Sequence, residues 1–248
     1  MHTIVLATQK GGSGKTTLAI GLALAALQAG HNVRMIDTDY QGTLAKWQVR
    51  RGLAEPVVEI VRGADLIERR LHSFDRGGVG LTIIDTASGV GETAAAAIRA
   101  CDLCMIPARP TVVDIEATAA TLSIVRRWRK PFAFILNQTP ARGPRVGDAA
   151  DALGGQTSDL ADVLAQPFIA MRNDHQDALA AGLAVSEYAP SGKSADEIRQ
   201  LWQWTRARLD DQPVRAAFPI DRARARSDAG VEPAAPCRET GLSWDAGL

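Results

Sequence analysis

Short runs of apolar residues alternate along the chain with longer segments in which apolar residues recur at helical spacing. Uninterrupted apolar runs are typical of strands buried on both faces of a parallel sheet, and the helices between them would cover those faces. We therefore expect an α/β fold with a mostly parallel, twisted sheet. The runs expected to form strands are Thr3–Ala7, Val33–Asp37, Val57–Val61, Leu81–Asp85, Leu103–Pro107 and Phe132–Asn137.

The segments with helical spacing follow these runs. The first of them is apolar nearly all round, so we expect it to be well buried. Residues 142–165 are rich in Gly, Asp and Ala and predict only a short helix and an edge strand. The segments expected to be helical are Thr16–Ala29, Thr43–Arg51, Ala64–His72, Glu92–Ala100, Val113–Trp128 and Ala195–Leu209.

The composition separates a domain from a tail. Residues 1–209 have the apolar content of one domain, whereas residues 210–248 contain four prolines, three glycines and few large apolar residues, so we expect a disordered tail there. The chain carries 28 basic and 28 acidic residues, so any contact with nucleic acid would need a local basic patch. No run reaches the roughly 18 apolar residues of a membrane span, and we expect a cytoplasmic protein without a membrane partner.

A glycine-rich loop follows the first expected strand. Residues 10–17 read Lys-Gly-Gly-Ser-Gly-Lys-Thr-Thr, a compressed phosphate-binding loop with an additional lysine, Lys10, at its start. Glycines let backbone N–H groups turn inward around an anion, and the following helix adds partial positive charge at its N-terminus. Lys15 would meet the outer phosphates, and the Thr16 hydroxyl would bind Mg²⁺. The loop residues predicted to bind a nucleotide are Gly11, Gly12, Ser13, Gly14, Lys15, Thr16 and Thr17.

Carboxylates lie at the ends of two of the expected strands. Asp37 and Asp39 follow one strand and Asp85 ends another, at the edge of a parallel sheet where ligands bind. A single aspartate in this position also fits a helix cap or a turn. Three of them downstream of a phosphate loop favour metal and water handling. The segment ending at Asp85 resembles a Walker B strand, whose aspartate would hold Mg²⁺ through water.

Two cysteines have the spacing of redox or metal motifs. Cys101 and Cys104 are separated by two residues, but the surrounding residues predict entry into a buried strand. A zinc site would need two further ligands, and the chain has no second pair of cysteines or paired histidines. The pattern therefore favours small buried thiols.

Taken together, these motifs resemble the deviant-Walker ATPases of the ParA/MinD family, and most closely the short, ParF-type partition proteins. Such proteins have a single P-loop NTPase domain. The resemblance covers residues 1–209 and departs from the family pattern at Tyr40, where proline is usual, and at Ala87-Ser88, where prolines are common. The matching segments are Lys10–Thr17, Asp37–Gln41, Ile84–Thr86, Cys101–Pro110 and Ala181–Tyr188.

The resemblance implies a Mg²⁺-dependent ATPase with a weak intrinsic rate that forms a homodimer when ATP binds. Its catalytic residues would be Lys15, Asp39, which positions the attacking water, and Lys10, which reaches the partner subunit's nucleotide. Mg²⁺ would be held by Thr16, Asp37 and Asp85. Hydrolysis would be stimulated by a ParB-like protein or a cargo adaptor, and the activity would segregate or position a cargo such as a plasmid or chromosome.

The base and the DNA contacts are also predicted. Asn137 suits an adenine edge and favours ATP, although it also fits a turn before Pro140. Family dimers bind DNA without sequence preference and associate with the nucleoid, which requires basic side chains facing phosphates. One candidate group lies near the last helix, at Arg172, Lys193, Arg199, Arg206 and Arg208. A second comprises Arg126, Arg127, Arg129 and Lys130, and each of these residues alone also fits a solvated helix face.

Other members of the same fold provide alternatives. A MinD-like switch or another cargo-positioning ATPase is the nearest, although the last residues lack the basic amphipathic helix of a membrane anchor. An ATP-dependent biosynthetic enzyme or an iron–sulfur carrier belongs to a different functional class. An iron–sulfur carrier would need cysteines at the subunit interface, whereas Cys101 and Cys104 are expected in the core.

Overall fold

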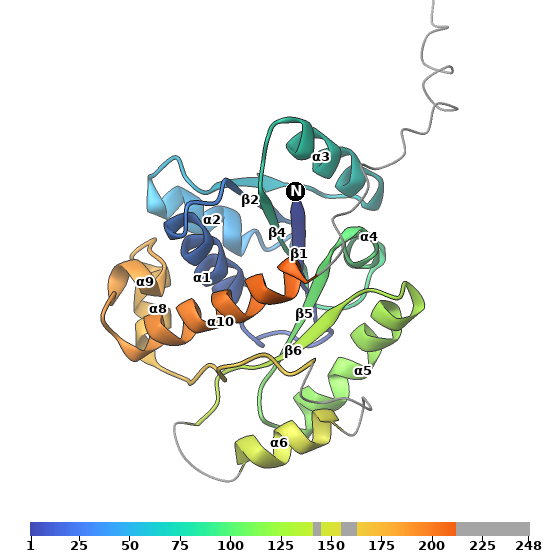
Figure 1. Ribbon diagram of the computed structural model, residues 1–248, viewed down its shortest axis with the longest axis vertical. Coiled ribbons are helices and arrows are strands. Elements are labelled where there is room, and N and C mark those ends of the chain that lie inside the picture. The colour runs from blue at the N-terminus through green and yellow to red at the C-terminus, as the bar shows by residue number, and fades with distance from the viewer. Residues whose placement is uncertain (141–144, 155–162, 212–248) are drawn as a thin grey trace, which may run out of the picture. The chain divides into compact units, whose positions relative to one another are not determined.

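The computed structural model describes residues 1–140, 145–154 and 163–211. Within them a six-stranded parallel sheet, with strand order β3-β2-β4-β1-β5-β6, carries helices on both faces (Figure 1). The predicted fold class is confirmed, and each predicted strand is present to within a residue at either end. The strands are β1 (His2–Leu6), β2 (Val33–Asp37), β3 (Val57–Ile60), β4 (Leu81–Asp85), β5 (Leu103–Ala108) and β6 (Phe132–Leu136).

The helices follow the prediction less closely. The helix α3 continues four residues beyond the predicted end at His72, because its apolar face extends to the buried Phe74. Two short helices, α8 and α9, were not predicted, and the edge strand expected within residues 142–165 is represented by an isolated bridge from Leu164 to Phe134. The helices are α1 (Lys15–Gln28), α2 (Thr43–Arg51), α3 (Ala64–Arg76), α4 (Glu92–Ala100), α5 (Val112–Arg127), α6 (Arg145–Gly154), α8 (Asn173–Ala180), α9 (Val185–Tyr188) and α10 (Lys193–Asp210).

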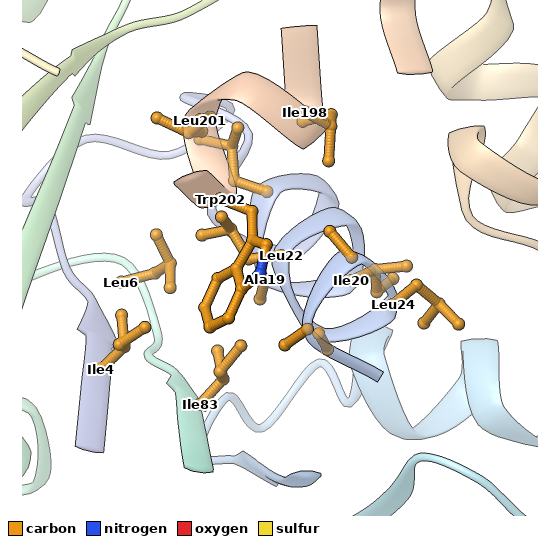
Figure 2. Close-up of a cluster of buried hydrophobic side chains, with 14 of the residues drawn as sticks. Ile4, Leu6, Ala19, Ile20, Leu22, Leu24, Ile83, Ile198, Leu201 and Trp202 are labelled. Atoms are coloured by element: carbon orange, nitrogen blue, oxygen red, sulfur yellow. The ribbon is translucent and has the colours of Figure 1, made fainter. Parts of the chain in front are cut away.

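Alternate residues of the strands belong to two separate hydrophobic clusters, one on each face of the sheet. Ile4 and Leu6 of β1 belong to the cluster under α1 and α10, whereas Val5 belongs to the cluster under α3, α4 and α5. Figure 2 shows the first cluster, in which side chains of the sheet, of α1 and of α10 meet, Trp202 among them. The predicted burial of the first helix is confirmed, since most of α1 is inaccessible to solvent. Among the described residues, helices therefore cover both faces of the sheet and leave its ends and edges for a ligand to approach.

Strand register determines which side chains meet at the carboxyl end of the sheet. Asp85 of β4 is paired with Leu6 of β1 on one side and with Asp37 of β2 on the other. The segment with the phosphate loop follows β1 after Leu6 and leads into α1, which begins at Lys15. The two aspartates and the glycine-rich loop are consequently neighbours. Most of the predicted tail, from residue 212 onward, lies outside the described residues.

Candidate nucleotide and metal site

The glycine-rich loop closes tightly around the N-terminus of α1. Gly14 is the N-cap of α1 and has a φ of 89°, a left-handed conformation that residues with a Cβ adopt at a cost. A Cβ at this position would also collide with the side-chain amide of Asn137. The first turn of α1 contains no acidic residue of its own that would offset its N-terminal partial charge. This end of α1 is suited to an anion.

Lys15 lies at the centre of the site. It is buried, and its Nζ donates a hydrogen bond to the Ser88 hydroxyl at 3.3 Å. Burial lowers the pKa of Lys15, while the nearby carboxylates of Asp85 and Asp39 act in the opposite direction. The charge of Asp39 therefore reaches Lys15, and the lysine and both carboxylates share one electrostatic environment.

Thr16 and Asp85 form a pair of oxygen donors beside the loop. The Thr16 hydroxyl donates to Asp85 Oδ2 at 2.6 Å, and Asp85 Oδ1 is buried without a hydrogen-bond partner among the described residues. Burial raises the pKa of Asp85 to about 7 despite the Thr16 hydrogen bond, and the adjacent Asp37 carboxylate contributes in the same direction. A buried oxygen without a partner is costly unless a ligand satisfies it, and hydroxyl and carboxylate oxygens are ligands that Mg²⁺ prefers. These residues fit a magnesium ion.

Asp37 and Asp39 shape the loop between β2 and α2. Asp37 accepts hydrogen bonds from the Asp39 amide at 2.9 Å and from the Ala45 amide at 3.0 Å, while Asp39 accepts one from the Gln41 amide at 2.9 Å. Both Asp37 oxygens thus stabilise the local backbone, as the alternative interpretation of a cap or turn residue requires. Its role as a magnesium ligand stays a prediction.

Lys10 lies on the rim of the site and is paired within its own chain. Its Nζ is 3.2 Å from Asp114 Oδ2, and the buried Asp114 also accepts a hydrogen bond from Arg109 Nε at 3.0 Å and one from the Thr111 hydroxyl. Burial alone would raise the pKa of Asp114, but the hydrogen bonds from Thr111, Arg109 and Lys10 together hold it below its usual value. Lys10 therefore has a strong counter-ion inside the monomer.

Sequence reasoning had assigned no role to Ser88, Arg109 or Asp114. Thr111 and Asp114 do form a recognisable helix-capping pattern, and the Thr111 hydroxyl accepts from the Asp114 amide. That pattern would have located the start of α5. It could not have identified Lys10, 104 residues earlier, as the partner of Asp114.

Asn137 and Gln138 hold the loop from the end of β6. Asn137 Nδ2 donates to the Ser13 carbonyl at 2.7 Å, and Gln138 Nε2 donates to the Gly12 carbonyl at 2.9 Å. Both side chains also line a cavity of about 160 Å³ between the loop and α8, together with Thr17. Asn137 thus supports the phosphate loop, and its contact with an adenine edge stays a prediction.

Three basic residues of the first group proposed for DNA are paired with carboxylates. Arg172 Nη1 lies 2.6 Å from Glu197 Oε2, Arg206 lies 3.4 Å from Asp210, and Arg199 pairs with Asp196. Lys193 is exposed at the start of α10, and Arg208 stacks on the Trp204 ring. In the second group, Lys130 donates to the Cys101 carbonyl, and Arg127 stacks on Trp128. Arg126 and Arg129 lie at or just beyond the end of α5. Neighbouring carboxylates therefore reduce the positive potential of the first group.

The cysteines agree with the prediction of buried thiols. Cys101 and Cys104 are both fully buried as free thiols, and burial raises the pKa of Cys104 well above its usual value. A thiol held in its protonated form is a poor metal ligand. Within the described ranges, no helix is both long and apolar enough to cross a membrane.

Comparisons with known proteins place these features in context. A family model described as VirC1 protein matches residues 1–131, slightly more than half of the 248 residues. Maintenance of carboxysome distribution protein A of Gloeobacter kilaueensis is 29% identical over 216 residues, which cover 84% of this chain and 94% of that protein. Protein virC1 of Rhizobium radiobacter is 27% identical over 130 residues, which cover 50% of this chain and 56% of that protein.

Two solved structures illustrate the likeness of fold. An ATP complex of a McdA variant from Cyanothece has a TM-score of 0.70 at 18% identity and covers 87% of this chain and 99% of its own. The septum site-determining protein MinD of Pyrococcus horikoshii OT3, complexed with Mg-ADP, has a TM-score of 0.62 at 18% identity and covers 82% and 94%. At these identities the comparison concerns the fold alone.

Proposed function

This chain belongs to the VirC1 protein family, and we propose that it is a Mg²⁺-dependent ATPase that dimerises on binding ATP and thereby segregates or positions a cargo. Its resemblance to the ParA/MinD-type ATPases is confirmed by that family match and by its relatives; the narrower ParF-type assignment stays a prediction. The single observation that carries the proposal is the loop Lys10–Thr17, closed at the N-terminus of α1 beside the Thr16–Asp85 pair.

The proposed chemistry uses residues that already share one site. Loop amides and Lys15 would bind the phosphates, and Asp39 would accept a hydrogen bond from the water that attacks the γ-phosphorus. The bond from the γ-phosphorus to ADP breaks as the bond to water oxygen forms. Bound Mg²⁺, held by Thr16 and Asp85 with Asp37 nearby, would neutralise phosphate charge.

Dimerisation would depend on Lys10. Its side chain is 32% exposed, so it can leave the rim for a phosphate of the partner subunit. Asp114 would then keep its bonds from Arg109 and Thr111, and departure of Lys10 would not leave a buried carboxylate unpaired. ATP would stabilise the dimer because two anionic phosphate groups at an interface need cations from both subunits.

The relatives suggest the class of cargo. Their names refer to carboxysome distribution, to VirC1 and to ParA, which supports positioning of a protein body or segregation of DNA. Both roles would use non-specific DNA as the track and a partner protein that stimulates hydrolysis. An iron–sulfur carrier is less well supported, since Cys101 and Cys104 are both buried and burial raises the pKa of Cys104.

The proposal is tested with two variants and one control. Lys15→Ala should bind ATP about 10- to 100-fold more weakly in calorimetry, because a charge-assisted contact to phosphate contributes about 1.5–3 kcal/mol. Asp39→Ala should keep its ATP affinity and accumulate as a dimer in light scattering, because hydrolysis no longer ends the dimeric state. Lys46→Ala, which removes an exposed lysine of α2, should match the wild type. Unchanged affinity in Lys15→Ala, or an Asp39→Ala protein that stays monomeric with ATP, would contradict the proposal.

A further inference from the structure

Arg62 contacts both ends of the segment that carries Asp39. Its Nη1 donates a hydrogen bond to the Asp37 carbonyl at 2.6 Å and lies 3.7 Å from Asp37 Oδ1. Its guanidinium carbon is 5.3 Å from the centre of the Tyr40 ring. One side chain, from the connection between β3 and α3, therefore spans residues 37 to 40.

The Tyr40 ring has little else to hold it. It is 85% exposed, so burial contributes little to its position, whereas Arg62 is only 22% exposed. The residue at position 40 also lacks the φ restraint that a proline would supply. The stack on Arg62 consequently restrains the part of the loop that is least restrained by packing.

Thr38 ties the start of this loop to β4, since its amide and its hydroxyl both donate to the Asp85 carbonyl, at 3.0 and 3.2 Å. The part of the loop beyond Thr38 is shaped by hydrogen bonds within the loop, from the Asp39 amide to Asp37 and from the Gln41 amide to Asp39. The Val61 amide and Arg62 both donate to the Asp37 carbonyl and tie the loop to the strand β3. The loop position matters because Asp39 is the carboxylate proposed to orient the water that attacks the γ-phosphorus.

We propose that Arg62 is a positioning residue for ATP hydrolysis, which holds the Asp37–Gly42 loop and thereby fixes the position of the Asp39 carboxylate. This inference rests on the proposed ATPase function. A planar guanidinium suits the role because its edge donates to the Asp37 carbonyl while its face covers the Tyr40 ring. A lysine could donate to the Asp37 carbonyl or lie over the Tyr40 ring, but its ammonium group has no planar face and edge with which to make both contacts at once.

Steady-state hydrolysis and ATP binding, measured on the full chain, test the inference. Arg62→Ala should lower kcat at least about 10-fold and leave the Kd for ATP within about threefold, since the contacts of Arg62 are with the Asp37–Gly42 loop and not with residues 10–17. Arg62→Lys should recover only part of the loss. Tyr40→Phe, which keeps the ring, should retain kcat, whereas Tyr40→Ala should lower it.

Two further variants make the test specific. The combination of Arg62→Ala with Tyr40→Ala should lower kcat by less than the product of the two separate effects, because both remove the same stack. Arg99→Ala is the matched control, since Arg99 stacks on Trp128 at 5.6 Å, away from the loop. It should leave kcat unchanged. Thermal unfolding of each variant identifies loss of fold. If Arg62→Ala does not fold, the comparison of kcat between Tyr40→Phe and Tyr40→Ala tests the inference by itself.

Several results would overturn the inference. Unchanged kcat in Arg62→Ala would do so, as would equal activities of Tyr40→Phe and Tyr40→Ala. A loss of ATP affinity as large as the loss of kcat would mean that Arg62 binds the nucleotide itself. Failure of the underlying function is distinguishable, because a wild-type protein that does not hydrolyse ATP refutes the ATPase. Wild-type activity that is lost in Asp39→Ala but kept in Arg62→Ala refutes only the role of Arg62.

Discussion

At the scale of single residues, Lys10 illustrates how a motif residue acquires a partner that the motif does not contain. The loop pattern identifies the lysine, and the fold brings Asp114 of α5 to within 3.2 Å of its Nζ. A lysine that must reach another subunit would first have to leave this carboxylate. In the proposed dimer, the ion pair would therefore oppose dimerisation by the free energy that it contributes to the monomer.

Asp114→Asn should make ATP-dependent dimerisation easier. The variant removes the charge that holds Lys10, and an ion pair with one exposed partner contributes up to about 1 kcal/mol. The ATP concentration at half-maximal dimer formation should fall about threefold to fivefold in light scattering.

The control for this change lies on the same helix. Glu116→Gln makes the same carboxylate-to-amide substitution at an exposed position of α5 and should leave the midpoint unchanged. A higher midpoint in Asp114→Asn would show that Asp114 assists the lysine rather than retaining it.

At the scale of elements, the helix α2 is attached to the α8–α9 region by close backbone contact. Gly182 has a φ of 71°, and a Cβ there would lie 2.7 Å from the carbonyl carbon of Arg50. The Trp47 indole donates to the Leu183 carbonyl at 3.2 Å across the same contact. Because α2 follows the Asp37–Gly42 loop, this contact determines where the far end of α2 lies.

Gly182→Ala should destabilise the protein by about 2–5 kcal/mol. The left-handed conformation costs a residue with a Cβ about 1–2 kcal/mol, and the steric overlap with α2 adds about 1–3 kcal/mol. Gly78→Ala provides the matched control, since Gly78 has a φ of 75° but no atom within 4 Å of an added Cβ. Urea unfolding should give the larger loss for Gly182→Ala, and equal losses would mean that the contact with α2 is unimportant.

The ion pair between α2 and α9 adds a dependence on pH. Arg51 donates to both oxygens of Glu187, each at 2.6 Å, and side-chain exposures are 4% and 23%. Burial would raise the pKa of Glu187, but the hydrogen bonds from Arg51 and the Ala184 amide hold it below its ordinary value of 4.5. The folded state thus binds this proton less readily than the unfolded state. The stabilisation is complete above pH 4.5 and is lost as the pH falls through the folded-state pKa.

Glu187→Gln should therefore lower the free energy of unfolding by about 2 kcal/mol at pH 7. The difference from the wild type should shrink as the pH falls below 4.5 and through the folded-state pKa, because the wild-type carboxylate then becomes protonated too. Denaturant unfolding at a series of pH values checks this. A difference that is independent of pH would indicate that the ion pair contributes little.

At the scale of the whole molecule, zero net charge and the carboxylate-paired arginines limit how DNA could be bound. Three arginines of the first candidate group, Arg172, Arg199 and Arg206, already have carboxylate partners within the subunit, so we expect retention on DNA only when ATP joins two subunits. Retention should weaken steeply between 50 and 200 mM salt, since binding through phosphates releases counterions.

Replacement of one predicted contact should change that salt dependence. Lys193→Ala should reduce, by about one, the slope of the logarithm of the DNA-binding constant against the logarithm of the salt concentration. Arg76→Ala, at the end of α3 and outside both candidate groups, should leave this slope unchanged. Filter binding to non-specific duplex DNA measures both. Retention without ATP, or retention insensitive to salt, would contradict DNA binding by an ATP-gated dimer.

The sequence by itself determined the local features. Alternating apolar runs predicted the sheet and most helices, because burial on both faces leaves a pattern within each segment. The loop Lys10–Thr17 could be recognised because its glycines and Lys15 act through backbone and side-chain groups that are close along the chain. The short helices α8 and α9 left no comparable pattern, since their few residues carry little apolar periodicity.

The tertiary structure alone decided which of these features meet. Strand order places Asp85 between Leu6 and Asp37, and packing brings Asp114 to Lys10 and Arg62 to the segment that carries Asp39. Such pairings join residues from separate elements, and any of several carboxylates or arginines in the sequence would have fitted equally well. Local pattern encodes what each segment buries, whereas the partners of polar side chains at the site depend on the register and packing of the complete fold.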